Sequence, residues 1–428
     1  MATRPLPEVV LIRGGTLYDP STGHSRQRDV LIVDGMLAAD GESVPSGAHV
    51  IEAAGCVVTH GFIDLHAHFR EPGGEDKETL ATGAEAAMAG GFTRVCVMAN
   101  TDPPVDSPEA IAAIREKSAQ LPVIIYPIGA ITAKMAGLEL AELRGMRSAG
   151  AVAFSDDGKP VTDGQVLRNA LLYAADLGLP IINHAEDAAL RGAGVMNEGA
   201  LSTRLGLPGN PGMAEESMVY RDLLLAQNTG GRLHVPHVST AGAVDQIRAF
   251  KAAGVAITAE ATPHHIALTE ELLRGFDTAA KVAPPLRTDR DREAVLAGLL
   301  DGVIDCIATD HAPHTVEDKE LDMVNAPFGM IALESAFGLA HQALAGAGAT
   351  VEQVIDMLTA RPAKVMGLEL TPLKPGAAAE LVVVDPHEEW TFGIGDIHSK
   401  SRNTPVPGMR LRGRVRATIT SKGLSDIN

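Results

Sequence analysis

The sequence predicts an α/β protein, a (β/α)8 barrel of the TIM type with a small β-sandwich domain formed from both chain ends. Through the middle of the chain, short apolar segments of strand type alternate with Ala/Leu/Glu-rich segments of helical composition. Both ends instead contain short strands and turns. The length of 428 residues suits a large barrel with an appendage. We expect residues 1–58 and 369–428 to form the β domain and residues 59–368 the barrel.

Eight strand candidates are expected to build the barrel: Phe62–Ala67, Thr93–Met98, Val123–Ile128, Ala151–Phe154, Pro180–Asn183, Arg232–Pro236, Val255–Ala259 and Ile304–Ala308. Six segments between them have helical composition: Leu80–Ala89, Pro108–Ala119, Val166–Ala175, Met213–Gln227, Ala241–Ala253 and Asp291–Leu300. An open doubly wound sheet is the alternative architecture. Such a sheet usually carries a glycine-rich phosphate loop after its first strand, where this chain has His66-Ala67-His68. Two later helices, Gly329–Ala345 and Val351–Val365, are expected to cover the barrel.

Strand patterns at the two ends of the chain resemble each other. Near the start, Val9–Arg13 precedes Gly14-Gly15, and Asp29–Val33 precedes Asp34-Gly35, a hairpin signal. Near the end lie two further strand candidates, Glu380–Asp385 and Arg410–Thr420. Neither set buries enough apolar surface alone, so we expect both to join in one β domain.

Composition restricts the class of partner and the compartment. The formal net charge of −18 argues against nucleic acid or an acidic membrane surface as a main partner. It still permits an anionic small substrate, which a few local Arg and His side chains can bind. No apolar run approaches the ~20 residues of a membrane span. The first residues lack the apolar core of a secretory signal, and the three cysteines lie far apart, so we expect a reducing, cytoplasmic location.

Histidines and carboxylates follow the predicted barrel strands. His66 and His68 end the first strand, where alternation puts both side chains on one face, about 7 Å apart. Similar groups follow five later strands: Asp156-Asp157, His184-Ala185-Glu186, His237, His264-His265 and Asp310-His311-Ala312-Pro313-His314. Because active sites of such barrels lie at the carboxyl ends of the strands, these groups predict a metal site. Four histidines with two carboxylates suit two metals about 3.5–4 Å apart that share a carboxylate.

The motifs around these residues resemble the amidohydrolase superfamily, and within it the class I dihydroorotases. They are Phe62-Ile63-Asp64-Leu65-His66-Ala67-His68-Phe69-Arg70-Glu71-Pro72-Gly73, Met98-Ala99-Asn100-Thr101, Phe154-Ser155-Asp156-Asp157-Gly158, His237-Val238-Ser239-Thr240, Thr262-Pro263-His264-His265 and Thr309-Asp310-His311-Ala312-Pro313-His314. The resemblance covers nearly the whole chain. It implies a barrel with a composite β domain and two Zn2+ ions per subunit.

The resemblance also implies a set of metal ligands. His66, His68 and Asp310 would bind the first ion, and His184 and His237 the second. Many members of the superfamily bridge the ions with a carboxylated lysine, whereas this chain has two aspartates at that position. Asp157 is the expected bridge, and Asp156 stays open as the alternative.

Further residues are implied to contact the substrate. His68 belongs to this set as well as to the metal ligands. Arg70, Asn100 and His314 would hold a carboxylate of the substrate. Phe328-Gly329 would offer backbone contacts to a pyrimidine ring. The family commonly has Asn before the Pro-Pro-Leu-Arg run, where this chain has Ala283. A lost hydrogen bond there could cost about 1–3 kcal/mol of binding free energy.

The implied activity is the reversible, zinc-dependent cyclisation of N-carbamoyl-L-aspartate to L-dihydroorotate in de novo UMP biosynthesis, with Asp310 as general base and acid. Two alternatives are another cyclic amidohydrolase of the hydantoinase or allantoinase type, and a catalytically silent scaffold for aspartate carbamoyltransferase. An active enzyme could also bind that transferase, and a homodimer is a further expectation. The segments 158–160 and 315–325 are candidate loops over the site.

Overall fold

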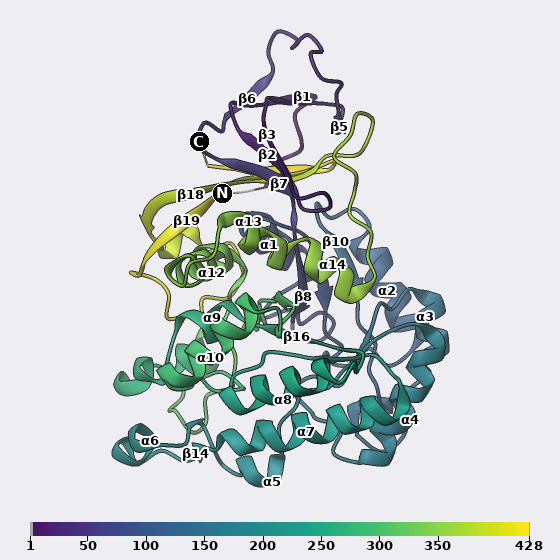
Figure 1. Ribbon diagram of the computed structural model, residues 1–428, viewed down its shortest axis with the longest axis vertical. Helices are drawn as coiled ribbons and strands as arrows, with labels where there is room; N and C mark the ends of the chain where they lie inside the picture. The colour runs from purple at the N-terminus through teal and green to yellow at the C-terminus, as the bar shows by residue number, and fades with distance from the viewer. Residues whose placement is uncertain (1–2, 428) are drawn as a thin grey trace.

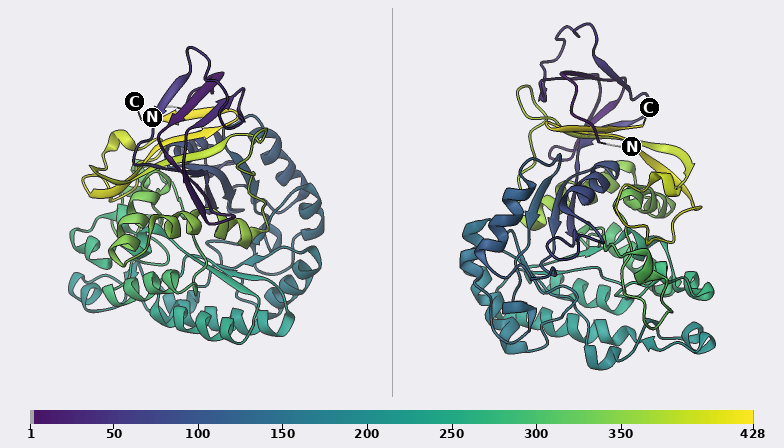
Figure 2. Two further views of the ribbon diagram at one scale, coloured as in Figure 1. Left: turned by 45° about the horizontal axis from the view of Figure 1, so that its top comes forward. Right: turned by 180° about the vertical axis from the view of Figure 1, so that it is seen from behind.

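The computed structural model describes residues 3–427, so residues 1, 2 and 428 of the predicted β domain lie outside it. The fold is α/β. In Figure 1, helices surround the parallel strands of the middle region, and the strands of both chain ends lie together above them. The same arrangement is seen from the other directions in Figure 2. Arg4 and Leu424, near the two ends of the described chain, pair in an antiparallel bridge. No helix in residues 3–427 is long and apolar enough to cross a membrane.

Eight parallel strands of the middle region form two sheets. The three-stranded sheet contains β8 (Phe62–Ala67), β9 (Phe92–Val97) and β10 (Ile124–Pro127). The five-stranded sheet contains β11 (Phe154–Ser155), β12 (Ile181–Ile182), β15 (Leu233–Val235), β16 (Ile257–Ala261) and β17 (Cys306–Ile307). Parallel bridges between Gly129 and Phe154, and between Ala67 and His311, link the two sheets at both edges. Each predicted strand of the middle region overlaps one of these eight strands. Because the strands are parallel, the side chains at their carboxyl ends lie at the same end of the sheets.

Helices separate consecutive strands. They are α1 (Leu80–Ala89), α2 (Pro108–Ser118), α3 (Leu143–Ala149), α4 (Gly164–Leu177), α7 (Gly212–Thr229), α8 (Ala241–Ala252) and α10 (Asp289–Leu300). Six of them overlap the segments of predicted helical composition, whereas the helix over Leu143–Ala149 was not predicted. Several begin at a side-chain cap, because Thr79, Ser107, Asp163, Thr240 and Thr288 each accept a hydrogen bond from a backbone nitrogen of the first turn. Three short helices, α5 (Ala188–Arg191), α6 (Ala200–Leu205) and α9 (Pro263–Ala267), lie in the loops that follow strands.

The prediction of a helix over Gly329–Ala345 was wrong at its start. The helix α12 spans Ala336–Gly346 and follows a 3-10 turn, η4 (Leu333–Ser335). Upstream, Met330 bridges to His311, and the Ile331 backbone nitrogen donates to the Asn403 carbonyl. These interactions hold the segment extended beside the end of β17, so it cannot be helical.

The predicted helix Val351–Val365 is two helices, α13 (Val351–Leu358) and α14 (Ala360–Met366). The break falls at Thr359, whose φ of −130° and ψ of −85° are not helical. Pro362 lies three residues later and lacks the backbone N–H that a continuous helix would need to bond to the Leu358 carbonyl. The proline was visible in the sequence, and the break follows from it.

The strands of the two chain ends share a sheet. This six-stranded sheet has the order β20 (Gly423–Asp426), β19 (Arg410–Thr420), β18 (Glu380–Thr391), β7 (Val57–His60), β2 (Thr16–Asp19) and β3 (His24–Gln27). β7 from the start of the chain pairs antiparallel with β18 from its end. A four-stranded sheet has the order β5 (Met36–Leu37), β4 (Val30–Val33), β1 (Val9–Arg13) and β6 (His49–Glu52). Apolar side chains from both sheets form one core cluster.

The two glycine-containing turns near the start of the chain differ in role. Asp34 and Gly35 connect β4 to β5 in a hairpin, and both have positive φ, 48° and 75°. These values fit a type I′ turn, so the hairpin signal is confirmed. Gly14 and Gly15 instead carry the chain from the four-stranded sheet to the six-stranded sheet.

Candidate metal centre and active site

Six side chains predicted as metal ligands meet at the carboxyl ends of the parallel strands. They lie at the end of β8 and just after β11, β12, β15 and β17, and all are buried: His66, His68, Asp157, His184, His237 and Asp310. The convergence follows from the parallel pairing, because strands of one direction present their carboxyl ends at the same edge. His66 and Asp310, which are far apart in the sequence, therefore lie close together in space.

Asp157 lies between two pairs of imidazoles. Its Oδ2 atom is 3.5 Å from Nε2 of His66 and 3.4 Å from Nε2 of His68. Its Oδ1 atom is 3.4 Å from Nδ1 of His184 and 3.4 Å from Nε2 of His237. Each carboxylate oxygen thus faces one histidine pair, an arrangement that suits two cations sharing a carboxylate.

Asp310 faces only the first of these pairs. Its Oδ1 atom is 3.0 Å from Nε2 of His68 and 3.5 Å from Nε2 of His66. Burial acts to raise the pKa of Asp310, but the adjacent His66 and the hydrogen bond from His68 outweigh it and hold that pKa well below its usual range. Asp310 is therefore an ionised carboxylate at neutral pH.

The two histidines of β8 are held with one nitrogen towards the cluster. Nδ1 of His66 donates to Oε1 of Glu260 at 2.8 Å, and Nδ1 of His68 donates to Oδ1 of Asn100 at 2.8 Å. In a neutral ring that binds a metal, this would leave Nε2 as the lone-pair nitrogen, whereas here Nε2 of His68 donates to Oδ1 of Asp310 at 3.0 Å. Nε2 of His66 is buried and forms no hydrogen bond within residues 3–427. Lone-pair imidazole nitrogens among carboxylates are a donor set that fits a divalent transition metal.

Asp156, the alternative bridge, has its carboxylate engaged elsewhere. Its Oδ1 atom accepts hydrogen bonds from the backbone nitrogens of Ile131 at 2.8 Å and Thr132 at 3.1 Å. Its Oδ2 atom accepts from the hydroxyl of Thr132. The two aspartates therefore face different ways, with Asp156 bonded to the loop after β10 and Asp157 turned to the histidines.

Three of the site residues have strained backbones. Of the seven non-glycine residues in the described chain that have positive φ, three are Arg70 at 59°, His237 at 34° and Asp310 at 48°. This region is costly for residues with a Cβ atom and persists where the surrounding structure enforces it. The surrounding fold therefore holds these three residues in a backbone conformation that costs free energy, and this conformation sets the direction of their side chains.

A cavity of about 310 Å³ opens beside the cluster. All of the predicted substrate-contacting residues line it: His68, Arg70, Asn100, His314, Phe328 and Gly329. Arg70 donates from Nε to the Pro313 carbonyl at 3.2 Å. Burial lowers the pKa of Arg70 to about 10, so the guanidinium stays charged at neutral pH. The cavity therefore combines a cation on one wall with the ionised cluster on another.

Three other histidines at or near the strand ends bond to protein groups outside the cluster, whereas His264 forms no hydrogen bond at either ring nitrogen within residues 3–427. His234 donates from Nε2 to Glu260 at 2.9 Å, and His265 bonds to the Pro284 carbonyl at 3.0 Å. His311 accepts a hydrogen bond at Nδ1 from the Ala332 backbone nitrogen at 3.1 Å. Strand-end position alone therefore overstates how many histidines face the metal cluster.

Sequence reasoning missed several residues that support the site. Glu260 accepts hydrogen bonds from both His66 and His234, and these bonds outweigh burial and lower its pKa to about 2. It is the only charged residue in β16, which could have drawn attention to it. Asn403 and Arg191 lie in a loop and a short helix, where no periodic pattern marks them.

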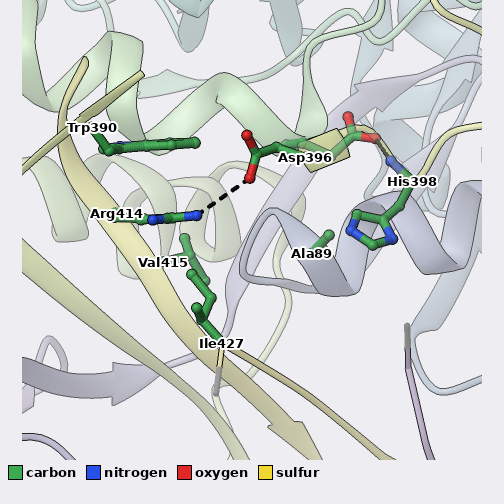
Figure 3. A pocket seen from close by; sticks show the side chains of 8 residues that line it. Ala89, Trp390, Asp396, His398, Arg414, Val415 and Ile427 are labelled. Atoms are coloured by element: carbon green, nitrogen blue, oxygen red, sulfur yellow. Dashed lines mark hydrogen bonds and ion pairs between the residues drawn. The ribbon is translucent and has the colours of Figure 1, made fainter. Parts of the chain in front are cut away.

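Two other features lie apart from this cluster. His234, Glu260 and Cys306 place ligand atoms within 4.8 Å of one another, but both oxygens of Glu260 already accept hydrogen bonds from histidines. A second cavity, of about 220 Å³, is shown in Figure 3. There Arg414 stacks on Trp390 and bonds to Asp396 at 3.3 Å, so its charge is already paired.

Solved structures define the class of protein to which this fold belongs. The chain superposes on L-hydantoinase (dihydropyrimidinase) from Arthrobacter aurescens with a TM-score of 0.82 and 24% identity, over 96% of this chain and 94% of that one. D-hydantoinase from a Bacillus sp. AR9 gives a TM-score of 0.79 at 26% identity, over 97% and 94%. The fold is thus that of the hydantoinase type of amidohydrolase.

Sequence relatives define the family. A family model described as "Dihydro-orotase-like" matches residues 55–243. The dihydroorotase of Pelotomaculum thermopropionicum is 50% identical over 412 residues, 96% of each chain. That of Anaeromyxobacter dehalogenans is 46% identical over 419 residues, 97% of each. The chain belongs to the dihydroorotase family of cyclic amidohydrolases.

Proposed function

We propose that this chain is a metal-dependent dihydroorotase, which catalyses the reversible cyclisation of N-carbamoyl-L-aspartate to L-dihydroorotate in de novo UMP biosynthesis. One observation supports this most directly. Asp157 lies between two histidine pairs with Asp310 beside them, and the adjoining cavity has a buried guanidinium on its wall. The close family relatives support the same substrate.

We also propose the architecture that this activity requires. The two parallel sheets, linked at both edges by bridges, are best explained as one (β/α)8 barrel over residues 59–368. The two sheets formed by residues 1–58 and 369–428, which share an apolar core, are best explained as a β-sandwich. In such a barrel, the cluster occupies the usual position of an active site.

Two Zn2+ ions are the proposed cofactors. His66, His68 and Asp310 would hold one ion, His184 and His237 the other, and Asp157 both. When bound, the ions would supply an activated water at neutral pH and stabilise the charge that develops on the amide oxygen. Asp157 would keep the total charge of the centre low enough for both ions to bind together.

Asp310 is the proposed proton carrier. As an ionised carboxylate it can accept the proton of the attacking water in the hydrolytic direction, and it can then deliver that proton to the departing ring nitrogen. In the biosynthetic direction the two transfers reverse. The positive φ of Asp310 and its contact with His68 fix the carboxylate at the edge of the cavity.

The cavity wall would orient the substrate. Arg70 is anchored through Nε, which leaves its two terminal nitrogens for a bidentate grip on the substrate carboxylate. Asn100 and His314 would add hydrogen bonds to the same carboxylate, and the backbone of Phe328 and Gly329 would contact the ring. A substrate held in this way presents its amide to the cluster.

A direct assay separates this proposal from its alternatives. Purified chain loaded with Zn2+ is expected to hydrolyse L-dihydroorotate, followed by ultraviolet absorbance, and to hold two ions per chain. Turnover of hydantoin or allantoin in its place would favour another cyclic amidohydrolase. A chain that binds no metal and turns over none of the three would favour a silent scaffold.

Partners and location are further proposals. The three cysteines are buried and unpaired, which fits the reducing cytoplasm. We propose a homodimer, and aspartate carbamoyltransferase as a protein partner, because the transferase makes the open-chain substrate. Light scattering of the chain, alone and mixed with that transferase, would test both associations.

A further inference from the structure

Arg191 contributes a second guanidinium to the wall of the substrate cavity. It is the last residue of the short helix α5, which follows the His184-Ala185-Glu186 segment. Its side chain is 31% exposed and lines the same cavity as Arg70. No role in the chemistry described above accounts for this second cation.

The guanidinium of Arg191 lies over the ring of Phe328. Its Cζ atom lies 4.9 Å from the ring centroid of Phe328, and Nζ of Lys281 lies 4.4 Å from the same centroid. Its Nε atom is 3.5 Å from Oε2 of Glu186 and has no hydrogen-bond partner in the described chain although it is buried. Oε1 of Glu186 accepts instead from Asn210 at 2.7 Å. The terminal nitrogens of Arg191 form no hydrogen bond within residues 3–427 and are therefore available to a molecule in the cavity.

One part of the cavity lacks a side-chain donor. Ala283, which lines the cavity together with Phe328 and Arg191, offers only a methyl group. An asparagine at this position would have presented an amide to the substrate. A buried carbonyl left without a hydrogen bond there would weaken binding.

We infer that Arg191 is a specificity-determining residue that donates to the ureido carbonyl of the substrate, taking the place of the amide that Ala283 lacks. This rests on the proposed function, in which Arg70 takes the carboxylate and the cluster takes the reacting amide. The ureido oxygen is then the remaining strong acceptor of the substrate. A guanidinium over the ring of Phe328 suits it, because the cation–π contact holds the donors at the cavity wall.

A double-mutant cycle between positions 191 and 283 tests the inference. Arg191→Met keeps the length that packs on Phe328 and removes every donor, so kcat/KM for L-dihydroorotate should fall about 10- to 100-fold, chiefly through KM. Adding Ala283→Asn to that variant should recover about 5- to 10-fold, a larger gain than the same substitution gives in the native chain. Arg204→Met, on an exposed part of α6, is the matched control and should leave KM unchanged.

Two readouts keep the test decisive. Bound zinc and the unfolding temperature should match the native chain. If Arg191→Met folds poorly, Arg191→Leu, which also has no donor, replaces it in the same cycle. N-thiocarbamoyl-L-aspartate, with sulfur in place of the ureido oxygen, should be discriminated against by the native chain and much less by Arg191→Met. An unchanged KM in the variant, or equal effects of Ala283→Asn in both backgrounds, would overturn the inference. A native chain without dihydroorotate turnover would instead overturn the proposed function.

Discussion

The side-chain oxygen of Asn403 accepts a hydrogen bond from the backbone nitrogen of His314 at 3.0 Å. The same amide donates from Nδ2 to the carbonyls of Ala312 at 3.0 Å and Gly329 at 3.1 Å. Asn403 is buried and belongs to the C-terminal segment that also supplies β18 and β19. One side chain from the end of the polypeptide thus holds two segments that line the substrate cavity.

Replacing Asn403 by Ala should raise KM for L-dihydroorotate about 10-fold or more with a smaller change in kcat. The substitution leaves buried polar groups unpaired, at about 1–3 kcal/mol, and frees the segments that carry His314 and Gly329. Steady-state kinetics with zinc analysis would measure this. Asn228→Ala, whose amide bonds only to the Leu224 carbonyl on α7, is the matched control. A normal KM in Asn403→Ala would mean that these segments hold their positions without the amide.

Asp310→Asn should reduce turnover by about 10²- to 10⁴-fold, because the amide cannot accept and return the proton. The fold should persist, since Asn fills the same volume. Turnover would be followed by ultraviolet absorbance, with metal analysis and circular dichroism as checks. A variant that binds both ions and keeps a near-normal rate would contradict the proton role of Asp310.

Glu260→Gln should weaken metal binding about 10- to 100-fold, because the carboxylate orients His66 and makes its nitrogen more basic. Competition with a zinc chelator would measure the affinity. Cys306→Ala is the control that separates this role from a metal site at His234, Glu260 and Cys306, and it should leave two ions per chain. Loss of one ion in Cys306→Ala would instead assign an ion to that group.

The sequence allowed the strands and the clustering of the candidate ligands to be predicted, but not the residues that hold those side chains in place. His66, His68 and Asp310 follow apolar segments, and parallel pairing brings such positions together. Asn403 lies in a loop far along the chain, and its partners are backbone groups that any residue type would present. Pro362 did indicate the break between α13 and α14, whereas the extended segment before α12 depends on contacts with His311 and Asn403 that are visible only in the fold.

Arg94→Met should lower the free energy of unfolding by about 3–5 kcal/mol, because it leaves the carboxylate of Glu380, whose side chain is only 12% exposed, without its cation. Arg94 on β9 donates to Glu380 on β18 at 2.6 and 2.8 Å, and so connects the parallel strands to the β domain. Urea unfolding would measure the loss. The double variant Arg94→Met, Glu380→Leu should recover much of it, since both charges are then removed. A double variant no more stable than Arg94→Met would show that the charge pair is not the cause.

Lys319 should make the stability of the protein depend on pH. Its Nζ atom donates to the carbonyls of Pro327 at 2.7 Å and Thr278 at 3.0 Å. Burial, reinforced by the nearby Lys281, lowers the pKa of Lys319 to about 7, against about 10.4 for an unfolded chain. Between these two values the unfolded state binds more protons than the folded state. The free energy of unfolding should therefore rise with pH, by roughly 1 kcal/mol per pH unit from this residue.

Urea unfolding of the native chain and of Lys319→Met between pH 6 and 9 would measure this contribution. The difference in unfolding free energy, native minus variant, should be lowest below about pH 7 and increase as the pH rises, because Lys319→Met has no proton to lose. Lys374→Met, which replaces an exposed lysine, should run parallel to the native chain over the whole range. Parallel curves for Lys319→Met as well would mean that Lys319 stays charged, with its ammonium fully satisfied by the carbonyls around it.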